Sequence, residues 1–190
     1  MYIKFGKRIF DIVISLILFI LSLPIFAILC MIVWCDVGWP ILFKQPRLGI
    51  NGKEFGIIKF RTIQGAIHYN QTLSYDEVNK QTSVVGKWLR LHCCDEMLQF
   101  WNVLLGHMSI VGPRPRQYTE YTRYNISNVV LKKLLSVLPG ITGGGQITMC
   151  KQFCTENWTP EHDLKYIDNI SWQNDLLIIL KTILIVIKGH

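Results

Sequence analysis

The sequence predicts a mainly helical α+β fold, in which an N-terminal membrane helix precedes a small β-hairpin and several amphipathic helices. Three observations carry this prediction. Residues 12–35 contain no charged side chain, which is typical of a membrane helix. An Asn51-Gly52 turn lies between two short runs of strand-forming residues, as in a β-hairpin. Later segments repeat their apolar residues at helical spacing, which indicates helices with one apolar face.

The composition favours a protein that meets a membrane. Half of the 190 residues are hydrophobic and 17% are charged, against about 25% charged residues in an ordinary globular chain. The formal net charge of +7 suits an anionic partner, either a phospholipid surface or a nucleic acid. The long uncharged segment favours the phospholipid, and the sequence has no recognised nucleic-acid-binding motif. We therefore expect a membrane partner and no nucleic acid.

The uncharged segment is long enough to cross a hydrocarbon core of about 30 Å as one helix. Pro24 lies at its middle and removes a backbone hydrogen bond, and Ser22 is close enough to help satisfy the break. Lys and Arg residues flank both ends, so the positive-inside tendency draws both ends to the cytoplasm. We therefore expect residues 1–36 to form a re-entrant helical hairpin, bent at Ser22 and Pro24; a straight span is the alternative.

The remaining residues, 37–190, are expected to form one interfacial domain in the cytoplasm. Residues 41–43 and 55–60 are the predicted strands of the hairpin. Residues 84–105 and 118–138 carry apolar residues at helical spacing and are each predicted to form one helix.

Three further segments complete the prediction. Residues 67–81 are polar and are expected to form a loop with some helix. Three consecutive glycines, residues 143–145, predict a flexible loop. Residues 175–188 are too short to span a bilayer, so they are expected either to lie in its interface or to pack into the core as a helix.

The six cysteines do not indicate a disulfide framework, because Cys93 and Cys94 are adjacent in the sequence. Cys150 and Cys154, with His162 beyond them, have a poor spacing for a zinc site and no second pair of ligands follows. Reduced thiols are the expected state.

Asp95 and Glu96 are the most distinctive polar residues of the chain. They are neighbours in apolar surroundings, where two carboxylates resist ionising together unless a cation or a proton is shared. The rigid segment Pro113-Arg114-Pro115 offers a guanidinium for a bidentate contact to phosphate. Lys59 and Arg61 alternate along a predicted strand and are expected on one side, as phosphate ligands or as an interfacial pair near anionic headgroups. The pattern predicts phosphate or metal chemistry, with solvated acids on a helix surface as the alternative.

Six short motifs follow one another along the chain. They are Lys7-Arg8-Ile9-Phe10-Asp11; Phe43-Lys44-Gln45-Pro46-Arg47-Leu48-Gly49; Lys59-Phe60-Arg61-Thr62; Asp95-Glu96 with Gln99 and Asn102-Val103-Leu104; Met108-Ser109-Ile110-Val111-Gly112-Pro113-Arg114-Pro115; and Pro139-Gly140-Ile141-Thr142-Gly143. Together, and over nearly the whole chain, they resemble the monotopic polyprenyl-phosphate phosphoglycosyl transferases of the bacterial sugar transferase family, in their minimal, single-domain form.

The resemblance implies an enzyme that moves a sugar phosphate from a nucleotide diphosphate sugar to polyprenyl phosphate, at the start of glycoconjugate synthesis. It implies that Asp95 is the nucleophile, which forms a covalent phosphosugar intermediate, and that Glu96 binds metal or handles a proton. Both acids are implied to engage Mg²⁺. The residues expected to bind substrate or phosphate are Lys59, Arg61, Arg114, Arg47 and Gln146. The implied location is the bacterial inner membrane, with the catalytic domain facing the cytoplasm; a homodimer is left open.

The chain departs from the family pattern at several positions. His107 stands where an acid usually precedes the Met-Ser pair, and Cys93-Cys94 replace the usual Ser-Leu before the two acids. Gly143-Gly144-Gly145-Gln146 replace Gly-Trp-Ala-Gln. We therefore expect activity with an unusual donor. The alternative is a catalytically silent membrane-bound relative that acts as a scaffold for glycan assembly.

Overall fold

The computed structural model describes residues 2–65, 75–148 and 158–188. Its α-helices are α1 (Lys7–Val37), α2 (Tyr75–Gln81), α3 (Val84–Leu91), α4 (Gln99–Leu104), α5 (Tyr118–Arg123), α6 (Asn128–Leu134), α7 (Gly144–Thr148), α8 (Glu161–Asp168) and α9 (Trp172–Lys188). Its strands are β1 (Leu42–Leu48), β2 (Glu54–Phe60), β3 (Ser109–Val111) and β4 (Gly140–Thr142). Short helical turns lie at η1 (Tyr2–Gly6), η2 (Ile50–Gly52) and η3 (Cys94–Glu96). The predicted mainly helical α+β class is confirmed.

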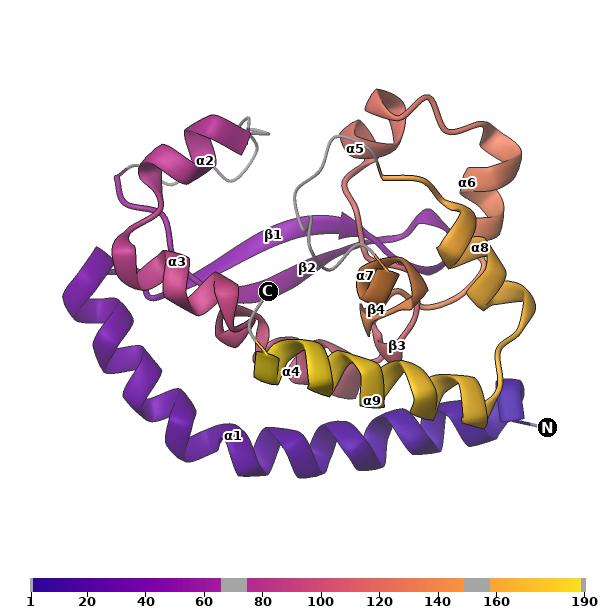
Figure 1. The fold of residues 1–190 in the computed structure, drawn as a ribbon, viewed down its shortest axis with the longest axis horizontal. Helices are drawn as coiled ribbons and strands as arrows, with labels where there is room; N and C mark the ends of the chain where they lie inside the picture. The colour runs from indigo at the N-terminus through magenta and orange to yellow at the C-terminus, as the bar shows by residue number, and fades with distance from the viewer. Residues whose placement is uncertain (1, 66–74, 149–157, 189–190) are drawn as a thin grey trace.

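The apolar N-terminal segment forms one continuous helix, α1, which is bent (Figure 1). It runs along the lower edge of the molecule in this view, and its last turns rise along the left side. Pro24 lies inside the helix, and the Ser22 hydroxyl donates a hydrogen bond of 2.7 Å to the Phe19 carbonyl. A proline inside a helix is the usual cause of such a bend, because it removes one backbone hydrogen bond. Within the described residues, α1 is the one helix long and apolar enough to cross a membrane.

Both ends of α1 are held by the rest of the protein. Near its start, Arg8 donates hydrogen bonds of 2.8 and 3.1 Å to the carbonyls of Val103 and Leu104, at the end of α4. The Asp11 carboxylate accepts a hydrogen bond of 3.0 Å from the backbone N–H of Ile110. At the other end, Asp36 accepts a hydrogen bond from the Ser83 hydroxyl. One folded unit therefore fixes both ends of the apolar helix.

The predicted hairpin is confirmed and is longer than expected. β1 and β2 pair antiparallel, from Leu42 opposite Phe60 to Leu48 opposite Glu54. The connection contains Asn51 and Gly52, both with positive φ angles of 56° and 76°. These conformations suit an Asn-Gly pair, so the turn chemistry fixes the hairpin.

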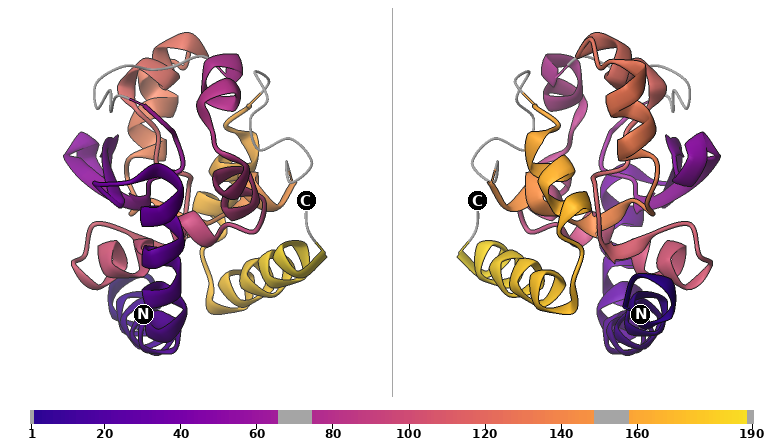
Figure 2. Two further views of the ribbon diagram at one scale, coloured as in Figure 1. Left: turned by 90° about the vertical axis from the view of Figure 1, so that its left-hand side faces the viewer. Right: turned by 90° about the vertical axis from the view of Figure 1, so that its right-hand side faces the viewer.

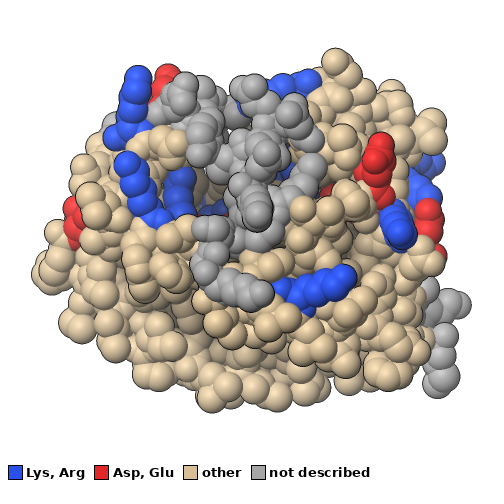
Figure 3. Space-filling model, in the orientation of Figure 1, with Lys and Arg blue, Asp and Glu red and all other residues tan. Residues whose placement is uncertain are grey.

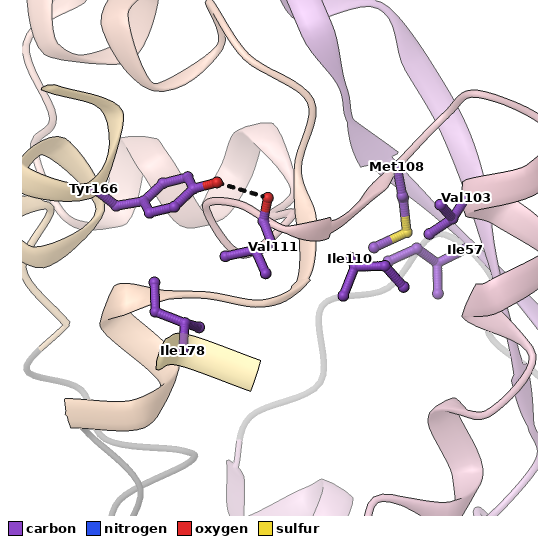
Figure 4. Packing of buried hydrophobic residues seen from close by; sticks show 7 residues of the cluster. All are labelled: Ile57, Val103, Met108, Ile110, Val111, Tyr166 and Ile178. Atoms are coloured by element: carbon purple, nitrogen blue, oxygen red, sulfur yellow. Dashed lines mark hydrogen bonds between the residues drawn. The ribbon is translucent and has the colours of Figure 1, made fainter. Parts of the chain in front are cut away.

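A parallel pair of short strands forms the centre of the core. β3 and β4 align Ser109 with Gly140 and Val111 with Thr142. Figure 4 shows how side chains from the hairpin, α4, β3, α8 and α9 meet around them, with the Tyr166 hydroxyl donating a 3.1 Å hydrogen bond to the Val111 carbonyl. This cluster brings the C-terminal helices against the segments that carry the family motifs.

Each of the two long helices predicted from apolar spacing is interrupted, so the prediction of continuous helices is wrong. Residues 84–105 form α3, the η3 turn and α4, because Cys93 adopts a left-handed conformation with a φ angle of 54°. Residues 118–138 form α5 and α6, separated where Asn125 has a φ angle of 50°. A left-handed residue ends an α-helix, and the spacing of apolar residues does not report it.

The prediction of a flexible loop at the three glycines is also wrong, since Gly144 and Gly145 begin α7. The buried Asp163 carboxylate accepts a hydrogen bond of 3.2 Å from the Gly145 N–H, which fixes this backbone. The predicted helix in residues 67–81 is present as α2, while residues 66–74 lie outside the described residues. Cys150 and Cys154, the poorly spaced zinc-ligand candidates, also lie outside the described residues.

The C-terminal segment forms α9, one face of which is buried through Asp175 and Ile178. The helix also exposes seven large apolar residues, which are Trp172, Leu176, Leu177, Leu180, Ile183, Leu184 and Ile187. Figures 1 and 2 show that α9 and the first part of α1 both lie on the lower side of the molecule. In Figure 3 the lower part of the visible surface carries no Lys, Arg, Asp or Glu, and the charges gather above it.

Candidate active site

Asp95 and Glu96 lie on the η3 turn between α3 and α4, and β2 packs against this turn. The left-handed Cys93 reverses the chain just before the turn, so the two acids point inward and do not lie along a helix surface. Only 7% of Asp95 is exposed. The alternative of solvated acids on a helix surface is therefore wrong.

Two cations hold the carboxylate of Glu96. Lys59 Nζ lies 2.7 Å from Glu96 Oε1, and Arg114 Nη2 lies 3.2 Å from the same oxygen. Burial alone would raise the pKa of Glu96, but the charges and hydrogen bonds of Lys59 and Arg114 outweigh it and hold that pKa well below its usual range. Glu96 is therefore an anion fixed in place by its partners.

Asp95 is in the opposite state. Burial and the neighbouring charge of Glu96 raise the pKa of Asp95, while Lys59 and Arg90 offset part of that rise. The ion pairs that Lys59 and Arg114 form at this turn go to Glu96. The ionised form of Glu96 is thus stabilised, whereas that of Asp95 is disfavoured by burial and by the charge beside it.

A group of arginines extends the positive charge beside the two acids. Arg47 donates hydrogen bonds to Glu120 and, at 2.8 Å, to Gln45, and Arg116 lies 3.2 Å from Glu120. The charge of Arg114 also reaches Arg47, and burial, as the largest cause, lowers the pKa of Arg47. Because Arg47 and Arg116 share one carboxylate, this region has an excess of positive charge that suits a phosphate-bearing ligand.

The structure brings together Lys59, Arg114 and the two acids, as predicted, but it takes Arg61 elsewhere. β2 ends at Phe60, so the strand alternation that would place Lys59 and Arg61 on one side stops before Arg61. The Arg61 guanidinium donates instead to the carbonyls of Val37, at the C-terminal end of α1, of Pro40 just beyond it, and of Ile63.

Gln146, also predicted to bind substrate, lies on α7 and donates a 2.9 Å hydrogen bond to the Ile141 carbonyl of β4. Its side-chain oxygen is buried and accepts no hydrogen bond within the described chain. His107, the departure before the Met-Ser pair, is exposed and its ring centroid lies 5.7 Å from that of Phe55. The predicted role of Gln146 stays a prediction.

Sequence reasoning missed three residues of this region, Arg90, Arg116 and Glu120. Arg90 comes from α3 and donates a 2.9 Å hydrogen bond to the Thr62 hydroxyl. Arg116 stacks on Trp158, with its guanidinium carbon 4.1 Å from the ring centroid. The position of Arg116 just after Pro115 was a signal that could have been used, whereas nothing in the sequence around Glu120 marks it as the shared partner of two arginines.

The two acids fit a magnesium ion whose coordination is completed by a substrate. In proteins, Mg²⁺ is commonly held by one or two carboxylates together with substrate phosphate oxygens and water. The described residues contain no group of three or more His, Cys, Asp or Glu side chains that could form a complete protein cage. Asp95 and the adjacent Glu96 are two carboxylates, which is the number of protein ligands that this smaller donor set requires.

Comparison with known proteins agrees with this chemistry. The profile of the family described as "Bacterial sugar transferase" matches residues 2–189. The chain is 34% identical to the UDP-glucose:undecaprenyl-phosphate glucose-1-phosphate transferase of Klebsiella pneumoniae, over 93% of this chain and 39% of that protein. It is 32% identical to the UDP-N-acetylgalactosamine-undecaprenyl-phosphate N-acetylgalactosaminephosphotransferase of Aeromonas hydrophila, over 97% of this chain and 44% of that protein.

A third relative is closer in length. The uncharacterized sugar transferase EpsL of Bacillus subtilis is 34% identical to the chain, and the match covers 93% of this chain and 85% of that protein. The chain thus spans less than half the length of the two relatives with named substrates.

Proposed function

The chain belongs to the bacterial sugar transferase family, and from this premise we propose that it transfers a sugar phosphate from a nucleotide diphosphate sugar to polyprenyl phosphate. The names of the Klebsiella and Aeromonas relatives, which describe transfer from a UDP-sugar to undecaprenyl phosphate, support the proposal. The observation that carries it is the unequal state of the two acids: Glu96 is paired with two cations, and the buried Asp95 has a raised pKa beside it.

In the first step, a carboxylate oxygen of Asp95 attacks the phosphorus atom nearest the sugar. A bond forms between Asp95 and that phosphorus, and the bond to the bridging oxygen of the diphosphate breaks. The nucleoside monophosphate leaves with the electron pair, and the sugar phosphate stays on Asp95. In the second step, a phosphate oxygen of the polyprenyl phosphate attacks the same phosphorus and releases the carboxylate of Asp95.

The chain's own cations stabilise the charge that moves in these steps. Lys59 and Arg114 lie on Glu96 and therefore border the reacting phosphate. Arg47 lies beside Arg114, where a buried guanidinium would meet the departing phosphate. Mg²⁺, held by Asp95 and Glu96 when bound, would add charge neutralisation for the diphosphate.

We further propose that α1 enters one leaflet of the bacterial inner membrane and returns, with the folded domain in the cytoplasm. The hydrogen bonds of Arg8 at its start and Asp36 at its end support this path, because a straight crossing would separate these partners by the bilayer. Exposed tryptophans, which favour membrane–water interfaces, also support the proposal that the protein lies at the membrane surface. They are Trp34, Trp39, Trp88, Trp101 and Trp172.

The test of the transfer reaction is intact mass spectrometry of the purified protein after incubation with Mg²⁺ and a panel of nucleotide diphosphate sugars. We expect a mass gain equal to one phosphosugar with at least one donor, together with release of a nucleoside monophosphate, and neither with Asp95→Asn. If the wild-type protein released no nucleoside monophosphate from any donor in the presence of polyprenyl phosphate, the proposal would fail. A mass gain that persists in Asp95→Asn would move the nucleophile to another residue.

A further inference from the structure

A cavity of about 570 Å³ lies between α7, α8 and α9. Its polar side chains include His162 and Lys165 from α8 and Lys181 from α9. Leu177 and Ile178 of α9 line its apolar side. Neither Asp95 nor Glu96 borders this cavity, so it is separate from the candidate active site.

The cavity is positively charged. Among the described residues that line it, none is Asp or Glu, and two are lysines. Neither Lys165 nor Lys181 forms an ion pair within the described chain, although the neighbouring Asp168 is paired at 2.7 Å with Lys133 of α6. Two unpaired lysines and a histidine around one hollow attract an anion with several acceptor oxygens.

The same cavity borders an apolar surface. Lys181 lies on α9 between Leu177 and Leu184, which are both exposed, and one helical turn separates each from the next. An apolar helix face with a lysine at the rim of a polar hollow matches a lipid, whose headgroup and acyl chains need these two environments side by side.

We propose that this cavity binds the phosphate headgroup of an anionic phospholipid, whose acyl chains lie against the exposed face of α9. The lipid carrier of the proposed reaction is a weaker fit, because it must present its phosphate to Asp95, and Asp95 does not border the cavity. The inference rests on the proposed seating at a membrane surface and not on the transfer reaction.

The test is native mass spectrometry of the full-length protein, extracted in detergent and supplied with equal amounts of phosphatidylglycerol and phosphatidylcholine. We expect the wild type to retain one phosphatidylglycerol molecule in preference to phosphatidylcholine. The variant Lys165→Gln/Lys181→Gln should reduce that preference about thirtyfold, since it removes two positive charges that attract an anionic headgroup. The matched control Lys53→Gln/Lys132→Gln removes the same charge from the hairpin turn and α6 and should leave the preference unchanged.

A charge-preserving variant, Lys165→Arg/Lys181→Arg, guards against a folding defect and should keep the preference. Equal retention of both lipids by the wild type, or an equal loss in the control, would overturn the proposal. Inorganic phosphate serves as the second probe: if it displaces the lipid at equimolar concentration, the cavity is a simple anion site and the proposal fails.

The outcomes also separate this inference from the proposed function. If the Gln variant raises the KM for polyprenyl phosphate while phosphatidylglycerol retention stays unchanged, the cavity belongs to the acceptor substrate and the proposal is overturned. If the wild type retains phosphatidylglycerol selectively but forms no phosphosugar adduct, the lipid site stands and the transfer reaction fails.

Discussion

Lys59 Nζ lies 2.7 Å from Glu96 Oε1, and this ion pair connects the end of the β-hairpin to the turn that carries both acids. Lys59 also acts on Asp95, whose pKa its charge lowers against the larger effect of burial. A single residue of β2 thus fixes one acid and adjusts the other. The hairpin contributes to the site through this residue and through Arg47 of β1.

Replacing Lys59 with Met should reduce the rate of adduct formation about 100-fold, a typical effect of losing one group that stabilises the transition-state charge. Lys59→Arg keeps the charge and should retain a larger share of the activity. The measurement is single-turnover formation of the phosphosugar adduct, followed by intact mass. Equal rates for the Met and Arg variants would show that the charge of Lys59 is not what the reaction uses.

The rate should rise with pH through a pKa above that of an ordinary aspartate. Asp95 must be ionised to attack, and burial together with Glu96 raises its pKa, so acid suppresses the rate at a higher pH than it would for an exposed aspartate. Lys59→Met removes a charge that lowers this pKa, and the acid limb should therefore move to still higher pH. If the acid limb of the pH–rate profile stayed at the same pH in Lys59→Met, the charge of Lys59 would not control the ionisation of Asp95.

The low pKa of Glu96 should make the protein more stable at neutral pH than in acid. Its pKa is lower in the folded protein than in the unfolded chain, so it stabilises the fold above its unfolded pKa, and this contribution is lost as the pH falls through the folded pKa. Glu96→Gln should lower the free energy of unfolding at neutral pH and reduce its decline between about pH 5 and pH 2. Thermal unfolding in detergent across this range measures the difference.

Asp95→Asn should abolish the adduct and yet make the protein more stable at neutral pH. The raised pKa of Asp95 means that its ionised form is disfavoured in the fold, and this cost is absent below its unfolded pKa and grows as the pH rises through the folded pKa. Removing a buried charge whose ionised form the fold disfavours should raise the free energy of unfolding by about 1 kcal/mol. A lower melting temperature for Asp95→Asn would mean that its carboxylate has a structural partner.

How far the sequence predicts this site depends on the kind of information each residue carries. Asp95, Glu96 and Arg114 were found because they belong to motifs, and the hairpin because Asn51-Gly52 has the chemistry of one turn type. The inward direction of the acids was not predicted, since it depends on the φ angle of Cys93, which no periodicity reports.

Tertiary contacts decided the remaining residues. Arg61 and Lys59 are close in sequence and chemically alike, but the end of β2 sends Arg61 to the carbonyls at the end of α1. Glu120 is close in sequence to Arg116 but 73 residues from Arg47, so only the fold brings Arg47 to this pair. Local pattern predicts elements and motifs, whereas the partners of each charge are set by packing.

The left-handed conformation of Cys93 is itself testable. A β-branched residue is strained at a φ angle of 54°, so Cys93→Val should destabilise the protein by about 1–2 kcal/mol and displace the acids. Cys93→Asn tolerates this conformation and should keep both stability and adduct formation. Burial raises the pKa of the Cys93 thiol to about 12, so the thiol is neutral at physiological pH and its loss removes no charge. If the Val and Asn variants unfolded at the same temperature, backbone strain at this position would not matter.

The path of α1 can be tested by labelling its two sides. Phe5→Cys places a thiol before the helix, and Lys53→Cys places one in the hairpin turn beyond it. The exposed Cys35 is changed to Ser. An impermeant thiol reagent should then reach both introduced thiols only from the cytoplasmic side. Pro24→Ala restores one helical hydrogen bond but leaves the anchors of Arg8 and Asp11, so it should keep most molecules in this arrangement. Adding Arg8→Ala and Asp11→Ala removes those anchors, and the straightened helix should then cross the bilayer in a measurable fraction of molecules, exposing Phe5→Cys on the outer side. Labelling of the two positions from opposite sides without these changes would contradict a re-entrant helix and leave a straight span.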